Sequence, residues 1–277
     1  MAVLLGLAVA ACFGSGDFFG GVASRHASTL TVLGVAQLVA VAGAAVAALA
    51  FSGSPSGGDL VLGAGAGALN VVALGALYQG LAIGRMGIVA PVTAVVGALV
   101  PVAWGIANGE RPATAALVGV GLAVGAGAMI AREHDAHARG SARRALLLAA
   151  GAGLVFGWSF VLYAETAHDS GFWPALTGRA AAAVLVLVAV LVAGTGLRLP
   201  TVDRRLAIFA GVTDIGATVL LLVAVRHDLE SLVAPVAALG PAFTVAWACA
   251  VLREPVARLQ VLGLGVAIVG LVLIAAG

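Results

Sequence analysis

The feature that most constrains this chain is an internal repeat. The Val-Ala-Pro-Val segment at residues 89–92 recurs at residues 233–236, which lie 144 positions further along. With no gap in the alignment, Glu110 then falls on Glu254. An apolar composition alone would produce many Ala, Val and Gly matches, so the proline and the glutamate are the informative ones. The repeat indicates a duplication, in which two related halves build the fold.

Composition places both halves in a membrane. Of the 277 residues, 62% are hydrophobic and 9% are charged, and the mean hydropathy is +1.15, whereas soluble domains have about 25% charged residues. A helix needs roughly 20 apolar residues to cross the hydrocarbon core. We therefore predict an all-α integral membrane protein with ten transmembrane helices, five in each repeat. The predicted spans are Leu4–Val22, Leu30–Phe51, Leu60–Ile83, Gly87–Ala107, Ala113–Ala131, Ala145–Ala164, Phe172–Leu197, Leu206–Val225, Leu232–Leu252 and Leu259–Ala276.

The polar segment between the halves is the natural boundary. It divides the chain into a first repeat at residues 1–131, a linker at 132–144 and a second repeat at 145–277. The linker contains a group of potential metal ligands, namely Glu133, His134, Asp135 and His137. We interpret them as part of a solvated linker, because metal sites are built on fixed scaffolds. No metal site and no cofactor is predicted.

The arginines predict the orientation of the helices. With the helices numbered in order, eleven arginines fall in the odd-numbered loops and only Arg111 and Arg226 in the even-numbered ones. Positively charged loops remain in the cytoplasm, so both termini should lie on the opposite side. Five spans per repeat is an odd number, so the two repeats should have inverted topology.

Glycines four residues apart predict close helix–helix contacts in a membrane. Gly63 and Gly67 form one such pair, and Gly121 and Gly125 form another. Packing is the expected role of both pairs.

Polar residues at membrane depth are the candidates for function, because a charge there costs roughly 2.5 to 3.5 kcal/mol and should face a cavity or a partner. Asp214 lies near the middle of the eighth span, and Asn70 is its equivalent in the third. Arg179 in the seventh span matches Gln37 in the second. A substrate or proton site and an interhelical hydrogen bond are both open readings of these residues. Arg179 needs an acidic partner, and Asp214 is the candidate.

Asp17 lies in the first span among several glycines, which could loosen the helix and expose carbonyl groups to a cavity. The alternative is a carboxylate at the membrane interface, held by Arg25 or by solvent. Further residues are candidates for lining a pathway, although packing is the simpler reading of each: Tyr78, Gln79, Trp158, Ser159 and Tyr163. Glu110 and Glu254 end matching helices beside Arg111 and Arg253, and we interpret them as structural charges that cap or hinge those helices.

Several motifs occur in both halves or in matching positions. They include a Phe-Gly pair in the first helix of each half (Phe13 and Phe156), Leu77-Tyr78 followed by Ala82, the Val-Ala-Pro-Val segment, a loop glutamate and a Gly-x-Gly final helix. This pattern resembles the EamA branch of the drug/metabolite transporter superfamily. The resemblance implies ten helices, a central cavity open to one side at a time, and export of small metabolites, amino acids or drugs from bacterial cells.

Two classes of function follow. The first is a secondary transporter in the cytoplasmic membrane of a bacterium, which exports a small molecule and has no nucleotide-binding motif for ATP. The alternative is a flippase for lipids or lipid-linked substrates, whose cavity would also be apolar. A membrane enzyme would need clustered acid–base or metal groups, and these charges are dispersed. The expected partners are a small-molecule substrate, membrane lipids and a coupling proton; no nucleic acid and no obligate protein partner is inferred.

Overall fold

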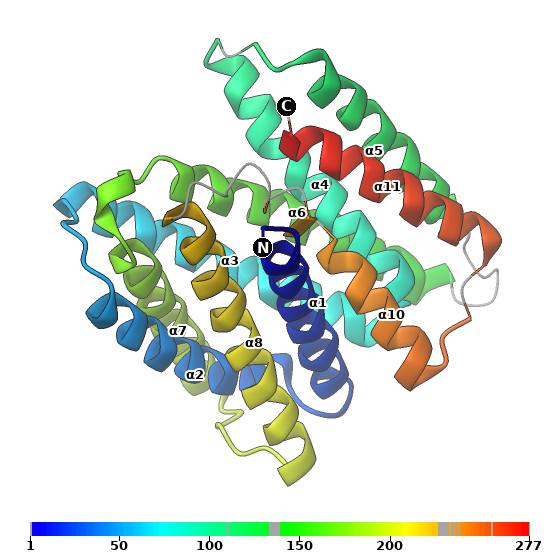
Figure 1. The fold of residues 1–277 in the computed structure, drawn as a ribbon. Helices are drawn as coiled ribbons and strands as arrows, with labels where there is room; N and C mark the ends of the chain where they lie inside the picture. The colour runs from blue at the N-terminus through cyan, green and yellow to red at the C-terminus, as the bar shows by residue number, and fades with distance from the viewer. Residues whose placement is uncertain are drawn as a thin grey trace.

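The computed structural model describes residues 2–109, 111–132, 139–226, 233, 236–237, 239–255 and 257–276. Glu110, the metal-ligand-like group of the linker and part of the ninth predicted span therefore lie outside the described residues. Within the described part the chain is all helical, as predicted (Figure 1). The helices are α1 (Ala2–His26), α2 (Thr29–Ala50), α3 (Gly57–Ile83), α4 (Met86–Ala107), α5 (Thr114–Arg132), α6 (Arg139–Ala164), the 3-10 turn η1 (His168–Ser170), α7 (Trp173–Ala193), α8 (Thr201–Arg226), α10 (Gly240–Leu252) and α11 (Arg258–Ala276).

Six of these helices are long and apolar enough to cross a membrane: α1, α2, α3, α4, α6 and α7. Shorter apolar stretches lie in α5, α10 and α11. Helix α8 is 26 residues long, but it begins near Asp203 and has Asp214 at its centre, which lowers its hydropathy. The described helices thus define a multi-pass membrane protein.

The end of α7 differs from the prediction. The seventh span was expected to continue to Leu197, but α7 ends at Ala193. Gly194 adopts a left-handed conformation (φ +65°), and its N–H group donates to the carbonyl groups of Val190 and Leu191. A glycine accepts this conformation without steric cost and closes the last turn, so the apolar residues that follow leave the helix.

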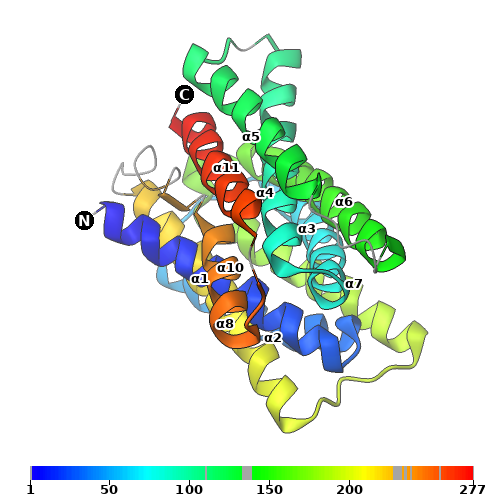
Figure 2. The ribbon, with the colours of Figure 1, turned by 90° about the vertical axis from the view of Figure 1, so that its right-hand side faces the viewer.

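Helices from the two halves of the chain alternate in the bundle. Helix α3 packs against α6 and α7, and α1 packs against α8 and α10. Helix α4 packs against α6, and α2 contacts both α7 and α8. Helices α5 and α11 lie side by side at one edge of the molecule in both views (Figures 1 and 2). The largest hydrophobic core is therefore shared by both halves of the chain.

Glycines permit the closest of these contacts. A side chain at Gly67 of α3 would overlap the backbone of Gly178 in α7, and Gly63 meets Pro174 one turn away. The predicted role of Gly63 and Gly67 is confirmed. The prediction for Gly121 and Gly125 was wrong, because no atom of the described residues lies within 4 Å of a methyl group added at either position. In α5 the contact is made by Gly119, where a methyl group would lie 2.6 Å from the Gly270 carbonyl of α11.

Candidate functional site

A buried ion pair joins α7 and α8 in the interior of the bundle. The Arg179 Nη1 atom lies 2.5 Å from Asp214 Oδ2, and the two side chains are 9% and 20% exposed. The second guanidinium nitrogen, Nη2, donates to Thr218 Oγ1 at 3.4 Å. The Thr218 hydroxyl in turn donates to the Asp214 carbonyl at 3.0 Å. The predicted pairing of Arg179 with Asp214 is confirmed, and it supplies the acidic partner that a buried arginine requires.

The packing of α3 on α7 brings Arg179 into the interior. Gly178, the residue before Arg179, lies against the backbone of Gly67. A side chain at Gly178 would also overlap the hydroxyl group of Tyr163 from α6. The Tyr163 hydroxyl consequently interacts electrostatically with the Arg179 guanidinium and the Asp214 carboxylate. The absence of a side chain at Gly178 thus gives the Tyr163 hydroxyl its place beside the ion pair.

Tyr78 of α3 lies on another side of the same group of residues. Its ring occupies the space above Gly20 of α1, and its hydroxyl donates to the Gly16 carbonyl at 3.4 Å. Arg179, Asp214 and Asp17 are all within electrostatic range of this buried hydroxyl. Tyr78, predicted as a lining residue, therefore joins α3 to α1 by a hydrogen bond and interacts electrostatically with the ion pair.

Asp17 of α1 belongs to the same group. Its neighbour Gly16 packs on α8, where a methyl group would lie 2.9 Å from Thr213 Oγ1 and 3.8 Å from the Asp214 nitrogen. The Asp17 carboxylate is within electrostatic range of Asp214. Among the described residues Asp17 forms no ion pair, since Arg25 pairs with Glu254 instead. The alternative in which Arg25 holds Asp17 was therefore wrong.

Three further candidates are not joined to the ion pair by hydrogen bonds within the described part of the chain. Gln37 of α2 is fully buried, and neither of its side-chain polar atoms has a partner there. Asn70 of α3 is partly exposed. Trp158 of α6 is 41% exposed and packs edge-on against Trp104 of α4, with ring centroids 5.4 Å apart. The group that the structure assembles is therefore Asp17, Tyr78, Tyr163, Arg179, Asp214 and Thr218.

Thr218 was not predicted. A hydroxyl residue four positions after an intramembrane aspartate was the available indication, because residues i and i+4 share a helix face. Among the described residues, groups of three or more His, Cys, Asp or Glu side chains that could bind a metal ion are absent. The chemistry of the site is therefore that of an ion pair, one further carboxylate and hydroxyl groups.

An interior ion pair in a bundle of membrane-spanning helices is typical of proteins that move a polar or charged species across the bilayer. The sequence comparison agrees with this class. Residues 143–276, in the second half of the chain, match the model of the EamA-like transporter family, which belongs to the drug/metabolite transporter superfamily. This half of the chain is therefore similar to a family of membrane transporters. None of the curated proteins matches the chain.

Solved structures show the same fold. A crystal structure described only as that of a protein aligns with 99% of this chain and 96% of its own, with a TM-score of 0.65 and 16% sequence identity. At this identity the likeness concerns the fold alone.

Proposed function

We propose that this protein is a secondary transporter that exports a small metabolite, an amino acid or a drug-like compound across the cytoplasmic membrane of a bacterium. The main support is the interior ion pair of Arg179 and Asp214, with Asp17, Tyr78 and Tyr163 around it. These five residues come from α1, α3, α6, α7 and α8, and so from both halves of the chain. A site between two repeats is where such transporters bind their substrates.

We further propose that the halves are inverted repeats, with α1, α3 and α4 equivalent to α6, α8 and α10. Equivalent contacts at the ends of the bundle support this arrangement. Asp59, in the first turn of α3, accepts from the Ala167 N–H just after α6 at 2.8 Å. Asp203, 144 positions after Asp59 and in the first turn of α8, lies 3.5 Å from His26 at the end of α1.

Equivalent contacts in the interior support it as well. The Ser159 hydroxyl of α6 donates to the Ala66 carbonyl of α3 at 2.8 Å. The matching residues are Gly16 and Ala210, and a methyl group at Gly16 would lie 3.4 Å from the Ala210 carbonyl. Trp104 of α4 contacts Trp158 of α6, and Trp158 matches Ser15 of α1. Ser15 accepts a hydrogen bond at 2.9 Å from Trp247 of α10, which lies one position before the match of Trp104. Under this symmetry Asn70 and Asp214 occupy equivalent positions.

We propose different roles for the two aspartates, because their surrounding charges differ. Because Arg179 compensates Asp214, we propose that Asp214 stays ionised and orients Arg179 or a charged group of the substrate. Asp17 is the carboxylate of this site that has no cationic partner among the described residues. It is therefore the better candidate to bind a coupling proton and release it on the other side of the membrane.

The test is a comparison of metabolite levels in cells with and without the protein. We expect at least one small compound to leave the producing cells faster, and we expect Asp214→Asn to abolish the difference. The matched control is Asp169→Asn, because Asp169 is exposed in η1. An unchanged metabolite profile, together with movement of a fluorescent lipid between leaflets of proteoliposomes, would replace the transporter by the flippase.

A further inference from the structure

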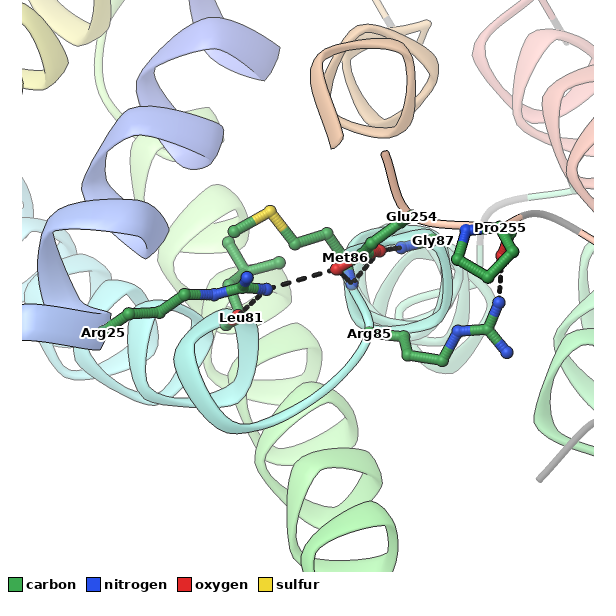
Figure 3. Close-up of polar contacts among 7 residues, drawn as sticks. All are labelled: Arg25, Leu81, Arg85, Met86, Gly87, Glu254 and Pro255. Carbon is green, nitrogen blue, oxygen red and sulfur yellow. Dashed lines mark hydrogen bonds and ion pairs between the residues drawn. The ribbon is translucent and has the colours of Figure 1, made fainter. Parts of the chain in front are cut away.

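A second charged group lies at the end of the bundle where α1, α3 and α10 finish. Its centre is Glu254, in the connection between α10 and α11. Figure 3 shows this carboxylate between Arg25 of α1 and the first residues of α4. These elements belong to different halves of the chain, so the group joins the halves at this end. We call it the Glu254 latch, formed by Arg25, Arg85, Met86, Gly87 and Glu254.

Glu254 caps a helix that lies 168 residues away in the chain. Its Oε2 atom accepts from the Met86 N–H at 3.0 Å and from the Gly87 N–H at 3.4 Å. The residue before α4, Arg85, provides no side-chain cap of its own. The first N–H groups of a helix lack acceptors and concentrate positive partial charge, so a carboxylate is stabilised there. The start of α4 therefore depends on the other half of the chain.

Two arginines extend the latch. Arg25 Nη2 donates to Glu254 Oε1 at 3.2 Å and to the Leu81 carbonyl at the end of α3 at 3.3 Å. Arg85 donates to the Pro255 carbonyl (Figure 3). It also donates, at 3.4 Å, to the side-chain oxygen of Gln260. Arg25 thus contacts the end of α3 and Glu254, and Arg85 contacts Pro255. Both arginines belong to the first half of the chain, and both contact the connection between α10 and α11 in the second half.

The turn that positions Glu254 is strained. Arg253 has a left-handed backbone (φ +53°) at the end of α10, a conformation that is sterically unfavourable for a non-glycine residue. Such a conformation persists only where its surroundings hold it, and it is common in segments that switch. Loss of the contacts to Glu254 would allow this turn to relax.

The latch has no counterpart of the same chemistry in the repeated sequence. Glu110 is the equivalent of Glu254 and lies outside the described residues. The residues that match Arg25 and Arg85 are His168 and Leu229, so the second copy lacks both arginines. The repeated sequence therefore does not supply the same two arginines at the other end of the bundle.

We propose that the Glu254 latch holds the transport pathway closed at this end, and that the end opens when Glu254 leaves the start of α4. This inference rests on the proposed transport function. Met86 provides the means to test it, because it is fully buried beside the latch, and a methyl group at Gly21 of α1 would lie 3.2 Å from its Cε. Separation of α1, α4 and α10 at this end would expose position 86.

The experiment measures how fast a charged, membrane-impermeant maleimide labels Met86→Cys. The native thiols are first removed by Cys12→Ala and Cys249→Ala. We expect Glu254→Gln to raise the labelling rate roughly tenfold, because a charge-assisted contact is lost while the side-chain volume is kept. The matched control, Glu165→Gln, removes an exposed carboxylate at the end of α6 and should leave the rate unchanged.

Two further measurements separate a latch from a local loss of structure. Arg25→Gln combined with Glu254→Gln should raise labelling no more than Glu254→Gln alone, because the two residues act as one pair. High salt should accelerate labelling of the unaltered latch but not of the Glu254→Gln variant, since the pair is partly exposed. If Glu254→Gln does not fold, Arg25→Gln replaces it, because this change leaves the cap of α4 in place.

Unchanged labelling in Glu254→Gln, equal increases in both glutamate variants, or additive effects of the double substitution would overturn the latch. The labelling requires no substrate. Labelling results that overturn the latch therefore leave the transport proposal intact. If instead labelling is salt-sensitive and the metabolite levels do not differ, the protein has a gate at this end but carries a different substrate.

Discussion

The two arginine–carboxylate pairs of this protein have the same chemistry and different environments. Arg179 and Asp214 lie in the interior, where a hydroxyl group is the other polar partner of the guanidinium. Arg25 and Glu254 lie at the end of the bundle, where the Glu254 carboxylate also accepts hydrogen bonds from the backbone N–H groups of Met86 and Gly87. An interior pair is costly to break because each charge is left without solvent. An end pair can open because water and salt replace the partner. The difference suggests a permanent site in the interior and a reversible contact at the end.

The largest effect is expected from removing one partner of the interior pair. Arg179→Leu leaves Asp214 as an uncompensated buried charge and should lower the free energy of unfolding by about 3 to 5 kcal/mol. Arg179→Leu with Asp214→Leu removes both charges and should recover most of that loss. Thermal unfolding of the detergent-solubilised protein measures both. A double variant no more stable than the single one would show that packing, not charge, determines the effect.

The scaffold of the interior pair should be the next most sensitive. Gly67→Ala forces α3 away from Gly178 and should destabilise the protein by about 1 to 3 kcal/mol through overpacking. Gly121→Ala is the matched control, because a methyl group there meets no atom of the described residues within 4 Å, and alanine favours a helix by about 1 kcal/mol over glycine. Equal melting temperatures for both variants would contradict the close α3–α7 contact.

The end pair should contribute less and should respond to salt. Glu254→Gln should lower the free energy of unfolding by about 1 to 2 kcal/mol at low ionic strength. In 1 M salt the difference between this variant and the unaltered protein should shrink, while the Arg179→Leu difference should persist. Chemical unfolding at two salt concentrations makes the comparison. The same salt response at both pairs would remove the distinction between interior and end.

The side of the membrane on which Arg25 and Glu254 lie can be tested by reporter fusions, and no change in stability is expected. The excess of arginines in the odd-numbered loops predicts that the latch faces the cytoplasm. A reporter placed in the 132–144 linker should then behave as cytoplasmic, and one fused after Gly277 as extracytoplasmic. The opposite pattern at both sites would place the latch on the outer face.

The sequence was sufficient for the helical class and for the interior pair. A buried arginine requires an acid, and Asp214 was the acid at matching depth, so the pairing followed from the cost of burial. The partners of Glu254 could not be predicted, because they depend on the left-handed turn at Arg253 and on the two-residue connection between α3 and α4. The end of α7 could not be predicted for a similar reason. The apolar pattern continues beyond Gly194, but the left-handed conformation of this glycine ends the helix.

The interior site is the centre of this account, and pH-dependent export tests it most directly. The compound found in the metabolite comparison is loaded into cells, and its efflux is followed at several external pH values. We expect efflux by the unaltered protein to vary with pH and Asp17→Asn to remove this variation. Asp214→Asn should stop efflux at every pH, with normal membrane insertion of both variants. Unchanged, equally pH-dependent efflux in both variants would contradict a coupling role for these carboxylates.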